Sequence, residues 1–370
     1  MRKHRAAVLT AALATLVVLA ACQGGGQAPT PTESGPSATG GEATGSPAAE
    51  PIDFLACMVS DVGGIDDKGF NQNSYDGLEL AEQRLGTGIR FLESTAATDY
   101  ERNINTFIDQ GCDVIVTVGF LLGDATQAAA EANPDQLFSI VDFAYDPPIE
   151  NVQGLVFDTK SASMLAGYLA AGMTQTGTVG TFGGVNIGPV TDFMNGYVAG
   201  VNYYNDQNGT DVTVLGWDAE AQDGTFTGDF EDQDKGRQTA EALMQEGADI
   251  IFPVAGPVGL GAMAAVQDSG EALYIGVDVD QAVSVPEYEN IMLSSVLKRL
   301  DNAVFASIED AVDGAFEENL YVGTLENEGV GLAEFHQFED EVPQELKDGI
   351  TELQEALISG DVTADDWQTP

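Results

Sequence analysis

Short apolar runs alternate with amphipathic stretches from about residue 54 to residue 357. Apolar runs rich in β-branched and aromatic residues, typical of strands, occupy 54–60, 89–92, 114–118, 137–141 and 152–157. Between the first two runs, Tyr75, Leu78, Ala81 and Leu85 recur at helical spacing before Gly86. A second helical stripe covers residues 100–108. This strand–helix order predicts a parallel sheet with helices on its faces.

The same order begins again in the second half of the chain. Strands are predicted at 179–182, 212–215, 250–252, 273–277 and 292–297, and helices at 161–173, 191–204, 236–246, 260–267, 302–316 and 345–357. Roughly three hundred residues are enough to build two lobes of ordinary size. The predicted fold class is therefore α/β, with two lobes that each contain a parallel sheet.

The first 51 residues have a different texture. Arg2, Lys3 and Arg5 precede an apolar stretch that is too short to span a bilayer, and Leu19-Ala20-Ala21-Cys22 follows. A small-small-Cys ending resembles the lipobox of bacterial lipoproteins, in which the Cys becomes lipidated. We therefore predict a lipoprotein signal peptide over 1–22 and lipid anchoring at Cys22 to a cell membrane, outside the cytoplasm. Residues 23–51 are mostly Gly, Ser, Thr, Ala and Pro, which predicts a flexible tether.

Acidic residues dominate the charge of the chain. It contains 13 Lys and Arg against 60 Asp and Glu, giving a net charge of −47. This balance argues against nucleic acid and anionic lipid surfaces as partners, because both need basic patches. The acids could bind cations, but we favour a solvated surface suited to a salty or acidic exterior.

Besides Cys22, the chain contains Cys57 and Cys112. Cys57 lies in the first predicted strand and Cys112 just ahead of the third, and these strands would be neighbours in a doubly wound sheet. Outside the cell the pair could form a disulfide. The alternative is two buried, small apolar residues.

Polar residues and glycines gather where the predicted strands end. They are Asp61, Gly119, Asp142, Gly183, Gly184, the segment 253–256, Asp278 and Asp280. Ligands of open α/β sheets bind outside the carboxyl ends of the strands. Two lobes that face each other through such edges would form a cleft lined with carboxylates. For four of the acids in these regions we favour a role as helix N-cap instead: Asp66, Asp67, Asp124 and Asp280.

The residue types indicate what this cleft could bind. Carboxylates accept hydrogen bonds from vicinal hydroxyls, so sugars and ribosides suit them. Phe70, after the turn at Asp66 and Asp67, and Phe230, in a loop rich in Gly and Asp, could stack on a base. Lys298 ends an apolar strand in a chain with few basic residues. It could offset the clustered acids or form a structural ion pair.

The segment 58–72, with Asp61, Phe70 and Asn71, looks like the opening motif of the basic membrane protein family. This family is the lipoprotein type of purine nucleoside receptor in ABC importers. Further similar segments follow in the family's order at 141–145, 151–154, 164–171, 179–184, 235–237, 247–256, 275–281 and 293–299. Together they cover about Phe54 to Phe316.

The resemblance implies a periplasmic-binding-protein type I fold with Rossmann-like lobes joined by a multi-strand hinge. The expected lobes are 52–157 plus 282–320 and 158–281 plus 321–370. The resemblance also implies that Phe70 and Phe230 sandwich a base whose edge Asp61 and Asn71 read. Asp142, Asp278 and Lys298 would hold the ribose hydroxyls, and Gly256 would leave room for the ligand. The expected partners are a purine nucleoside and a membrane permease, and the expected state is a monomer.

Three alternatives to this assignment remain. The loop from Gln222 to Asp234 looks expanded relative to the family, so Phe226 or Trp217 could replace Phe230 as the stacking residue. The same fold could bind a sugar or a flavin, or serve as a sensor subunit. A nucleoside hydrolase is disfavoured because Gly63 stands where its Asp pattern needs an acid, and the sequence has no His/Cys metal spacing. We therefore expect no catalytic residues, metal or cofactor.

Overall fold

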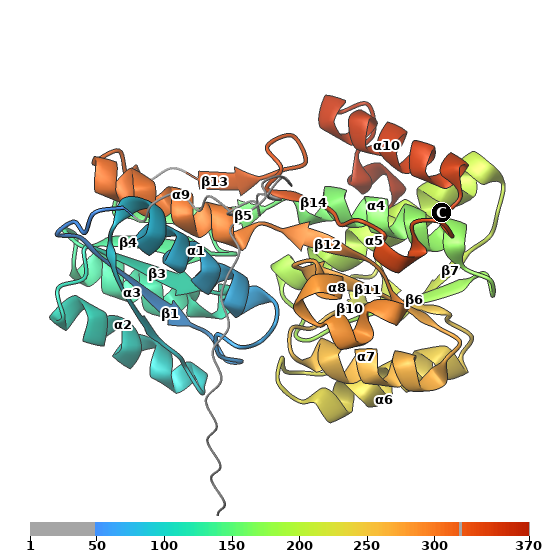
Figure 1. Cartoon of the computed structure of the whole chain (residues 1–370), viewed down its shortest axis with the longest axis horizontal. Coiled ribbons are helices and arrows are strands. Elements are labelled where there is room, and N and C mark those ends of the chain that lie inside the picture. Colours follow the sequence, from blue (N-terminus) through green and yellow to red (C-terminus); the bar gives the residue numbers. More distant parts are fainter. Residues whose placement is uncertain (1–48, 318–319, 370) are drawn as a thin grey trace, which may run out of the picture. The chain divides into compact units, whose positions relative to one another are not determined.

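Two six-stranded sheets organise the residues that the computed structural model describes, 49–317 and 320–369 (Figure 1). The predicted signal peptide, Cys22 and nearly all of the predicted tether lie outside the described residues. The α/β architecture with parallel sheets confirms the predicted fold class.

The first sheet has the strand order β13-β5-β4-β3-β1-β2, and all of its neighbouring strands are parallel. Its strands are β1 (Leu55–Ser60), β2 (Gly88–Leu92), β3 (Val114–Val118), β4 (Leu137–Val141), β5 (Val152–Phe157) and β13 (Leu320–Gly323). Helices α1 (Phe70–Leu85) and α9 (Leu300–Asp313) pack on one face, and α2 (Tyr100–Asp109) and α3 (Gly123–Ala132) on the other. Alternate residues of β1 accordingly enter two different apolar clusters, Ala56 and Met58 in one and Cys57 and Val59 in the other.

The second sheet has the order β14-β12-β11-β10-β6-β7, and its only antiparallel strand among the described residues is β14. Its strands are β6 (Thr178–Gly183), β7 (Thr213–Leu215), β10 (Ile250–Val254), β11 (Leu273–Asp278), β12 (Met292–Lys298) and β14 (Val330–Leu332). One face is covered by α4 (Thr159–Met173), α5 (Gly188–Asn208) and α10 (Gln344–Ser359). The other face is covered by α6 (Gln233–Gln245) and α7 (Val258–Ser269).

Short elements complete the described chain. They are the hairpin of β8 (Trp217–Asp218) and β9 (Asp223–Gly224), helix α8 (Gln281–Ser284), and the 3-10 turns η1 (Ala97–Asp99), η2 (Phe120–Leu122), η3 (Pro286–Ile291), η4 (His336–Phe338) and η5 (Ala364–Trp367).

The described chain passes between the two sheets three times: after β5, after β12, and between β13 and β14. Backbone hydrogen bonds tie these passages together, since the amide of Asp158 donates to the carbonyl of Gly323 and that of Arg299 to the carbonyl of Gly329. The predicted multi-strand connection is therefore present.

One strand differs from the expected division into lobes. The division assigned 282–320 to the first lobe, but β12 pairs with β11 and β14 in the second sheet. The chain thus returns to the first sheet only after Lys298, with α9. The pairing partner of an apolar strand depends on the tertiary fold, and the strand's own sequence does not reveal it.

Cys57 and Cys112 form a disulfide, which decides between the two alternatives left open by the sequence. Cys57 lies in β1, and Cys112 lies in the turn that leads into β3, the neighbour of β1 in the sheet. Both residues are buried in the cluster beneath α2 and α3. The disulfide therefore closes a covalent loop around β1, α1, β2 and α2.

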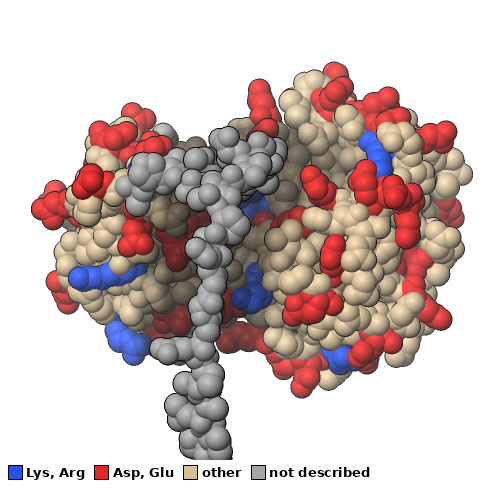
Figure 2. Space-filling model, in the orientation of Figure 1, with Lys and Arg blue, Asp and Glu red and all other residues tan. Residues whose placement is uncertain are grey.

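Acidic side chains are spread over the face of the molecule seen in Figure 2, with a few Lys and Arg among them. Within 49–317 and 320–369, no group of three or more His, Cys, Asp or Glu residues could hold a metal ion. Over the same ranges, no helix combines the length and the apolar character needed to cross a bilayer.

The disulfide yields a stability prediction. Replacing both Cys57 and Cys112 with Ala should lower the free energy of unfolding by about 2–4 kcal/mol, because the unfolded chain regains the freedom of a long closed loop. Urea unfolding measures this change. Adding a reductant should destabilise only the parent protein, and equal unfolding midpoints for parent and variant would contradict the prediction.

Candidate functional site

A pocket opens where the carboxyl ends of the two sheets face each other. It has an empty volume of about 630 Å³, which includes space open to solvent. It draws residues from the ends of β1, β4, β10, β11 and β12 and from the start of α1. The structure brings together all eight residues proposed from the sequence: Asp61, Phe70, Asn71, Asp142, Phe230, Gly256, Asp278 and Lys298.

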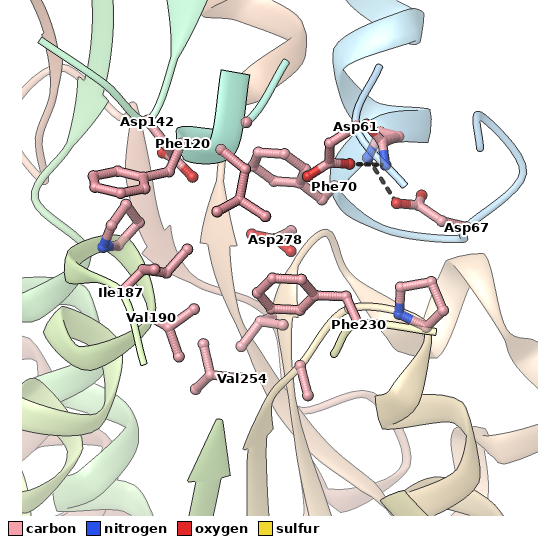
Figure 3. Close-up of a pocket in the computed structure, with 18 of the residues that line it drawn as sticks. Asp61, Asp67, Phe70, Phe120, Asp142, Ile187, Val190, Phe230, Val254 and Asp278 are labelled. Carbon is pink, nitrogen blue, oxygen red and sulfur yellow. Dashed lines mark hydrogen bonds between the residues drawn. The ribbon is translucent and has the colours of Figure 1, made fainter. Parts of the chain in front are cut away.

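Two phenylalanines enter the pocket from different lobes. Phe70 is the first residue of α1, and Phe230 lies in the loop before α6. In Figure 3 their rings lie on either side of Asp278. The ring of Phe230 packs so closely on Gly184 that a Cβ at Gly184 would come within 2.3 Å of it. A glycine at that position is therefore required for Phe230 to take this place.

The two other aromatic candidates do not line the pocket. Phe226 packs edge-on against Trp217, with ring centroids 5.8 Å apart. The indole of Trp217 is buried, and its Nε1 donates a hydrogen bond to Asn195. Of the three candidates, Phe230 alone can reach a ligand in this pocket.

Asp67 fixes the start of α1. Its carboxylate accepts hydrogen bonds from the backbone amides of Gly69, Asn71 and Gln72, at 2.9, 2.8 and 3.0 Å. The N-cap position of α1 is Gly69, so Asp67 caps the first turn from two residues before it and not as the N-cap residue itself. The cap sets the positions of Phe70 and Asn71, and Asp67 itself also lines the pocket. Asp280 does occupy the N-cap position of α8, but its side chain makes no capping hydrogen bond.

Asp61 and Asn71 are joined side chain to side chain. Asn71 Nδ2 donates to Asp61 Oδ1 at 2.8 Å, and both side chains are buried (Figure 3). The other carboxylate oxygen of Asp61 lies against Gly119, where a Cβ would come within 2.7 Å of it. Gly119 has φ +116°, so both the backbone and the close approach call for glycine here.

Lys298 and Asp142 line the pocket and connect the two sheets there. Lys298 Nζ lies 2.5 Å from Asp142 Oδ2, and the two side chains are 2% and 9% exposed. The ammonium also lies over the rings of Phe70, Phe157 and Phe193, at 4.8, 5.2 and 5.9 Å from their centroids. Of the two roles weighed for Lys298, an ion pair is present, and it lies within the acidic pocket.

Burial changes the acidity of the pocket carboxyls. Loss of hydration raises the pKa of Asp61 to about 8, and the nearby acids Asp67 and Asp142 add to the effect while the Asn71 hydrogen bond opposes it. Burial likewise raises the pKa of Asp278 to about 7, and the positive charge of Lys298 opposes that shift. Asp61 and Asp278 can therefore hold or lose a proton near neutral pH.

Two of these acids occupy a sparsely populated backbone region. Asp142 follows β4 with φ +64°, and Asp278 ends β11 with φ +69°. Asp tolerates this region better than most residues. Each turn directs a carboxylate toward the same pocket, one from each sheet. Such outliers cluster at ligand sites, which strengthens the case for a binding site here.

Sequence reasoning missed much of the apolar lining. Phe120 and Leu121 in η2, Pro189, Val190 and Phe193 in α5, and Pro257 before α7 also border the pocket. Their spacing alone does not separate a pocket wall from a core position, although Phe120 directly follows the predicted strand-end Gly119. His336 is not among the lining residues and lies 2.7 Å from Asp280.

Comparison with known proteins defines the class. Residues 54–360 match the family model described as ABC transporter substrate-binding protein PnrA-like, also called Bmp. The chain belongs to this family, which confirms the resemblance seen in the sequence. It is therefore a substrate-binding protein of an ABC transporter, a class that binds a small-molecule ligand and a permease.

Curated relatives are similar over most of their length. The ABC transporter nucleoside-binding protein BmpA of Lactococcus lactis subsp. cremoris is 31% identical, over 98% of this chain and 99% of that protein. Basic membrane protein A of Borreliella burgdorferi is 31% identical, over 63% of this chain and 65% of that protein. An uncharacterized lipoprotein of Pyrococcus abyssi is 30% identical, over 81% of this chain and 77% of that protein.

Solved structures agree with this assignment. A solute-binding protein of an ABC transporter system from Aeropyrum pernix K1 superposes with a TM-score of 0.76 at 28% identity, covering 84% of this chain and 92% of that one. A second such protein, from Conexibacter woesei, has a TM-score of 0.65 at 23% identity, covering 84% and 98%. These neighbours support the periplasmic-binding-protein type I fold.

The buried ion pair yields a stability prediction. Replacing Lys298 with Met should lower the free energy of unfolding by about 3–5 kcal/mol at neutral pH, because Asp142 would keep its burial and lose its cation. Urea unfolding at neutral pH measures the loss. Lys298→Arg, which keeps the charge, should lose less. Equal stabilities of Lys298→Met and the parent protein would contradict the prediction.

Proposed function

We propose that the pocket binds a purine nucleoside, or a closely similar riboside, and that the protein delivers it to an ABC permease. The observation that carries this proposal is the placement of Phe70 and Phe230, from different lobes, around one pocket with the acids Asp142 and Asp278. A ligand that combines a flat ring with vicinal hydroxyls uses both kinds of group.

The base would lie between the two phenyl rings. Stacking on an aromatic side chain contributes about 1–3 kcal/mol per base and suits any flat heterocycle. The polar edge of the base would then face Asp61 and Asn71, which sit together at the start of α1. The rest of the wall near η2 and α5 is apolar and suits the ring faces.

The sugar would lie toward Lys298. Asp142 and Asp278 supply carboxylate oxygens for the ribose hydroxyls, and Lys298 can donate to a hydroxyl oxygen. Gly256, with φ +53°, would leave room for the ribose beside the backbone. A phosphate would meet several acids and a single Lys that is already paired with Asp142, so nucleotides should bind poorly.

Contacts from both lobes suggest how binding is coupled to transport. Ligand contacts are complete only when the two lobes approach each other, so the ligand favours a closed form over an open one. The three passages of chain between the sheets would act as the hinge. The closed form would dock on the permease and release its cargo unreacted.

The name of the Lactococcus relative, a nucleoside-binding protein, supports the ligand class. We further propose that the protein works outside the cytoplasm as a monomer, held at the membrane by a lipid on Cys22. Residues 23–51 would tether the lobes to this anchor. The refined lobes are then 52–157 with 299–323 and 158–298 with 324–370.

Isothermal titration calorimetry tests the proposed function. Inosine, guanosine or adenosine should bind with a Kd of about 1 μM or tighter, which is roughly −8 kcal/mol or better. Free ribose and inosine 5′-monophosphate should bind far more weakly. Bound nucleoside should be recovered intact by chromatography, whereas accumulating free base would indicate hydrolysis. Absence of binding by all three purine nucleosides would refute the proposal.

The stacking role of Phe230 can be tested against a neighbour. Phe230→Ala should weaken nucleoside binding by roughly 5- to 150-fold, the equivalent of one lost stack of about 1–3 kcal/mol. Phe226→Leu is the matched control, because Phe226 packs against Trp217 in the core. It should leave the Kd nearly unchanged. Equal effects of the two substitutions would remove Phe230 from the site.

A further inference from the structure

We propose that Asp61 binds the nucleoside as an uncharged carboxylic acid that donates a hydrogen bond to the base, while Asn71 Oδ1 accepts one from it. This inference rests on the proposed function and specifies the chemistry of the base edge. The pair would recognise a heterocycle that places a hydrogen-bond acceptor beside an N–H donor. In adenine, a ring nitrogen and the exocyclic amino group form such an edge.

The orientation of Asn71 is fixed by its neighbours. Its Nδ2 donates to Asp61 Oδ1 at 2.8 Å and lies 3.4 Å from the carbonyl oxygen of Val62. The Val62 carbonyl can only accept, so the amide nitrogen must face this side, and the same nitrogen then donates to Asp61 Oδ1. Asn71 Oδ1 is then left buried without a hydrogen-bond partner among the described residues, in a side chain that lines the pocket and is 2% exposed. A buried acceptor of this kind calls for a donor from a ligand.

The surroundings of Asp61 favour its uncharged form. The residue is 8% exposed, and its electrostatic neighbours Asp67, Asp142 and Glu231 are all acids. The phenol of Tyr100 in α2 also lies close enough to interact with it. Lys298, the only Lys or Arg among the described lining residues, is bonded to Asp142 instead. A carboxylate in this position would have little access to water and would have no Lys or Arg among the described lining residues bonded to it.

In the uncharged form of Asp61, the proton lies on Oδ2. Asp61 Oδ1 accepts the Asn71 amide hydrogen, which leaves Oδ2 to carry the proton. Burial raises the pKa of Asp61 to about 8, so the acid would hold this proton at neutral pH and lose it above about pH 8. Once ionised, the carboxylate would turn an acceptor toward the acceptor of the base, and binding would weaken.

Asp278 affects the pH profile in the opposite direction. Its pKa is about 7, and its ionised form is the better acceptor for a ribose hydroxyl. Affinity should therefore rise as Asp278 ionises and fall as Asp61 ionises, giving a maximum between the two pKa values. The fall in affinity above about pH 8, the descending limb of the profile, comes from Asp61. A nucleoside site in which Asp61 is already ionised would not show this fall.

Calorimetry with adenosine across about pH 6 to 9.5 tests the inference. Adenosine is the probe because its base does not titrate in this range. For the parent protein the Kd should rise toward about tenfold per pH unit above pH 8. Asp61→Asn keeps a donor at this position and cannot ionise, so it should still bind adenosine at neutral pH, more weakly than the parent because an amide N–H is a weaker donor than a carboxylic acid, and its affinity should not fall above pH 8. Asp66→Asn, an exposed Asp in the same loop, is the matched control and should behave as the parent does.

Infrared spectroscopy supplies a second readout that does not depend on the variant's affinity. The difference spectrum between the parent and Asp61→Asn adenosine complexes at neutral pH should show a carbonyl band of a protonated carboxylic acid that only the parent has, because any contribution of Asp278 is common to both proteins and cancels. A parent affinity that stays constant above pH 8, or loss of binding at neutral pH in a folded Asp61→Asn protein, would overturn the inference while the proposed function stands. A parent protein that binds no purine nucleoside at all would overturn both.

Discussion

One buried ammonium holds the site together. Lys298 lies at the end of β12, where the chain leaves the second sheet, and its partner Asp142 follows β4 in the first sheet. The pair therefore links the two lobes at the pocket itself. A buried cation needs close and complete compensation, and Lys298 obtains it from the Asp142 carboxylate and the faces of three phenylalanine rings. This requirement constrains how the strand ends of the two sheets can be placed.

The same interaction divides the carboxyls of the pocket into two kinds. Asp142 has the cation as its hydrogen-bond partner, and Asp278 feels its charge through space. Asp61 lies near Asn71 and the other acids, and the charges named as acting on it are those of acids. Its pKa rises further than that of Asp278, whose pKa the positive charge of Lys298 lowers. One pocket thus offers acceptors suited to hydroxyl groups on the Lys298 side and a group suited to hold a proton on the Asn71 side.

Much of this arrangement could be predicted from the sequence, because the strands of a parallel sheet are buried apolar runs and its ligand sites lie at their carboxyl ends. The runs 114–118, 137–141 and 152–157 are predicted with the bounds that the structure has, since continuous β-branched runs flanked by turns leave little choice. The rule that ligands bind beyond the carboxyl ends of strands then brings together residues as distant as Asp61 and Lys298. The family resemblance added the residue roles, which residue types alone do not specify.

Other features depend on tertiary contacts, which no local sequence pattern reveals. Helix α3 (Gly123–Ala132) was indicated only by the N-cap interpretation of Asp124, because its many alanines give a weak apolar stripe, and Asp124 lies in its first turn and not at its N-cap. Strands β13 and β14 are short and exist through pairing with β5 and β12. The sequence left the Cys57–Cys112 pairing open, because it depends on the distance between two neighbouring strands. The choice of Phe230 over Phe226 depends on a loop whose path follows from packing on Gly183 and Gly184.

A crystal structure of the protein grown with a purine nucleoside tests the central claim most directly. The account predicts electron density for one intact nucleoside, with its base between the Phe70 and Phe230 rings and its ribose hydroxyls on Asp142 and Asp278. Nucleoside density elsewhere on the protein, or a pocket that stays filled by its own side chains at saturating ligand, would contradict it.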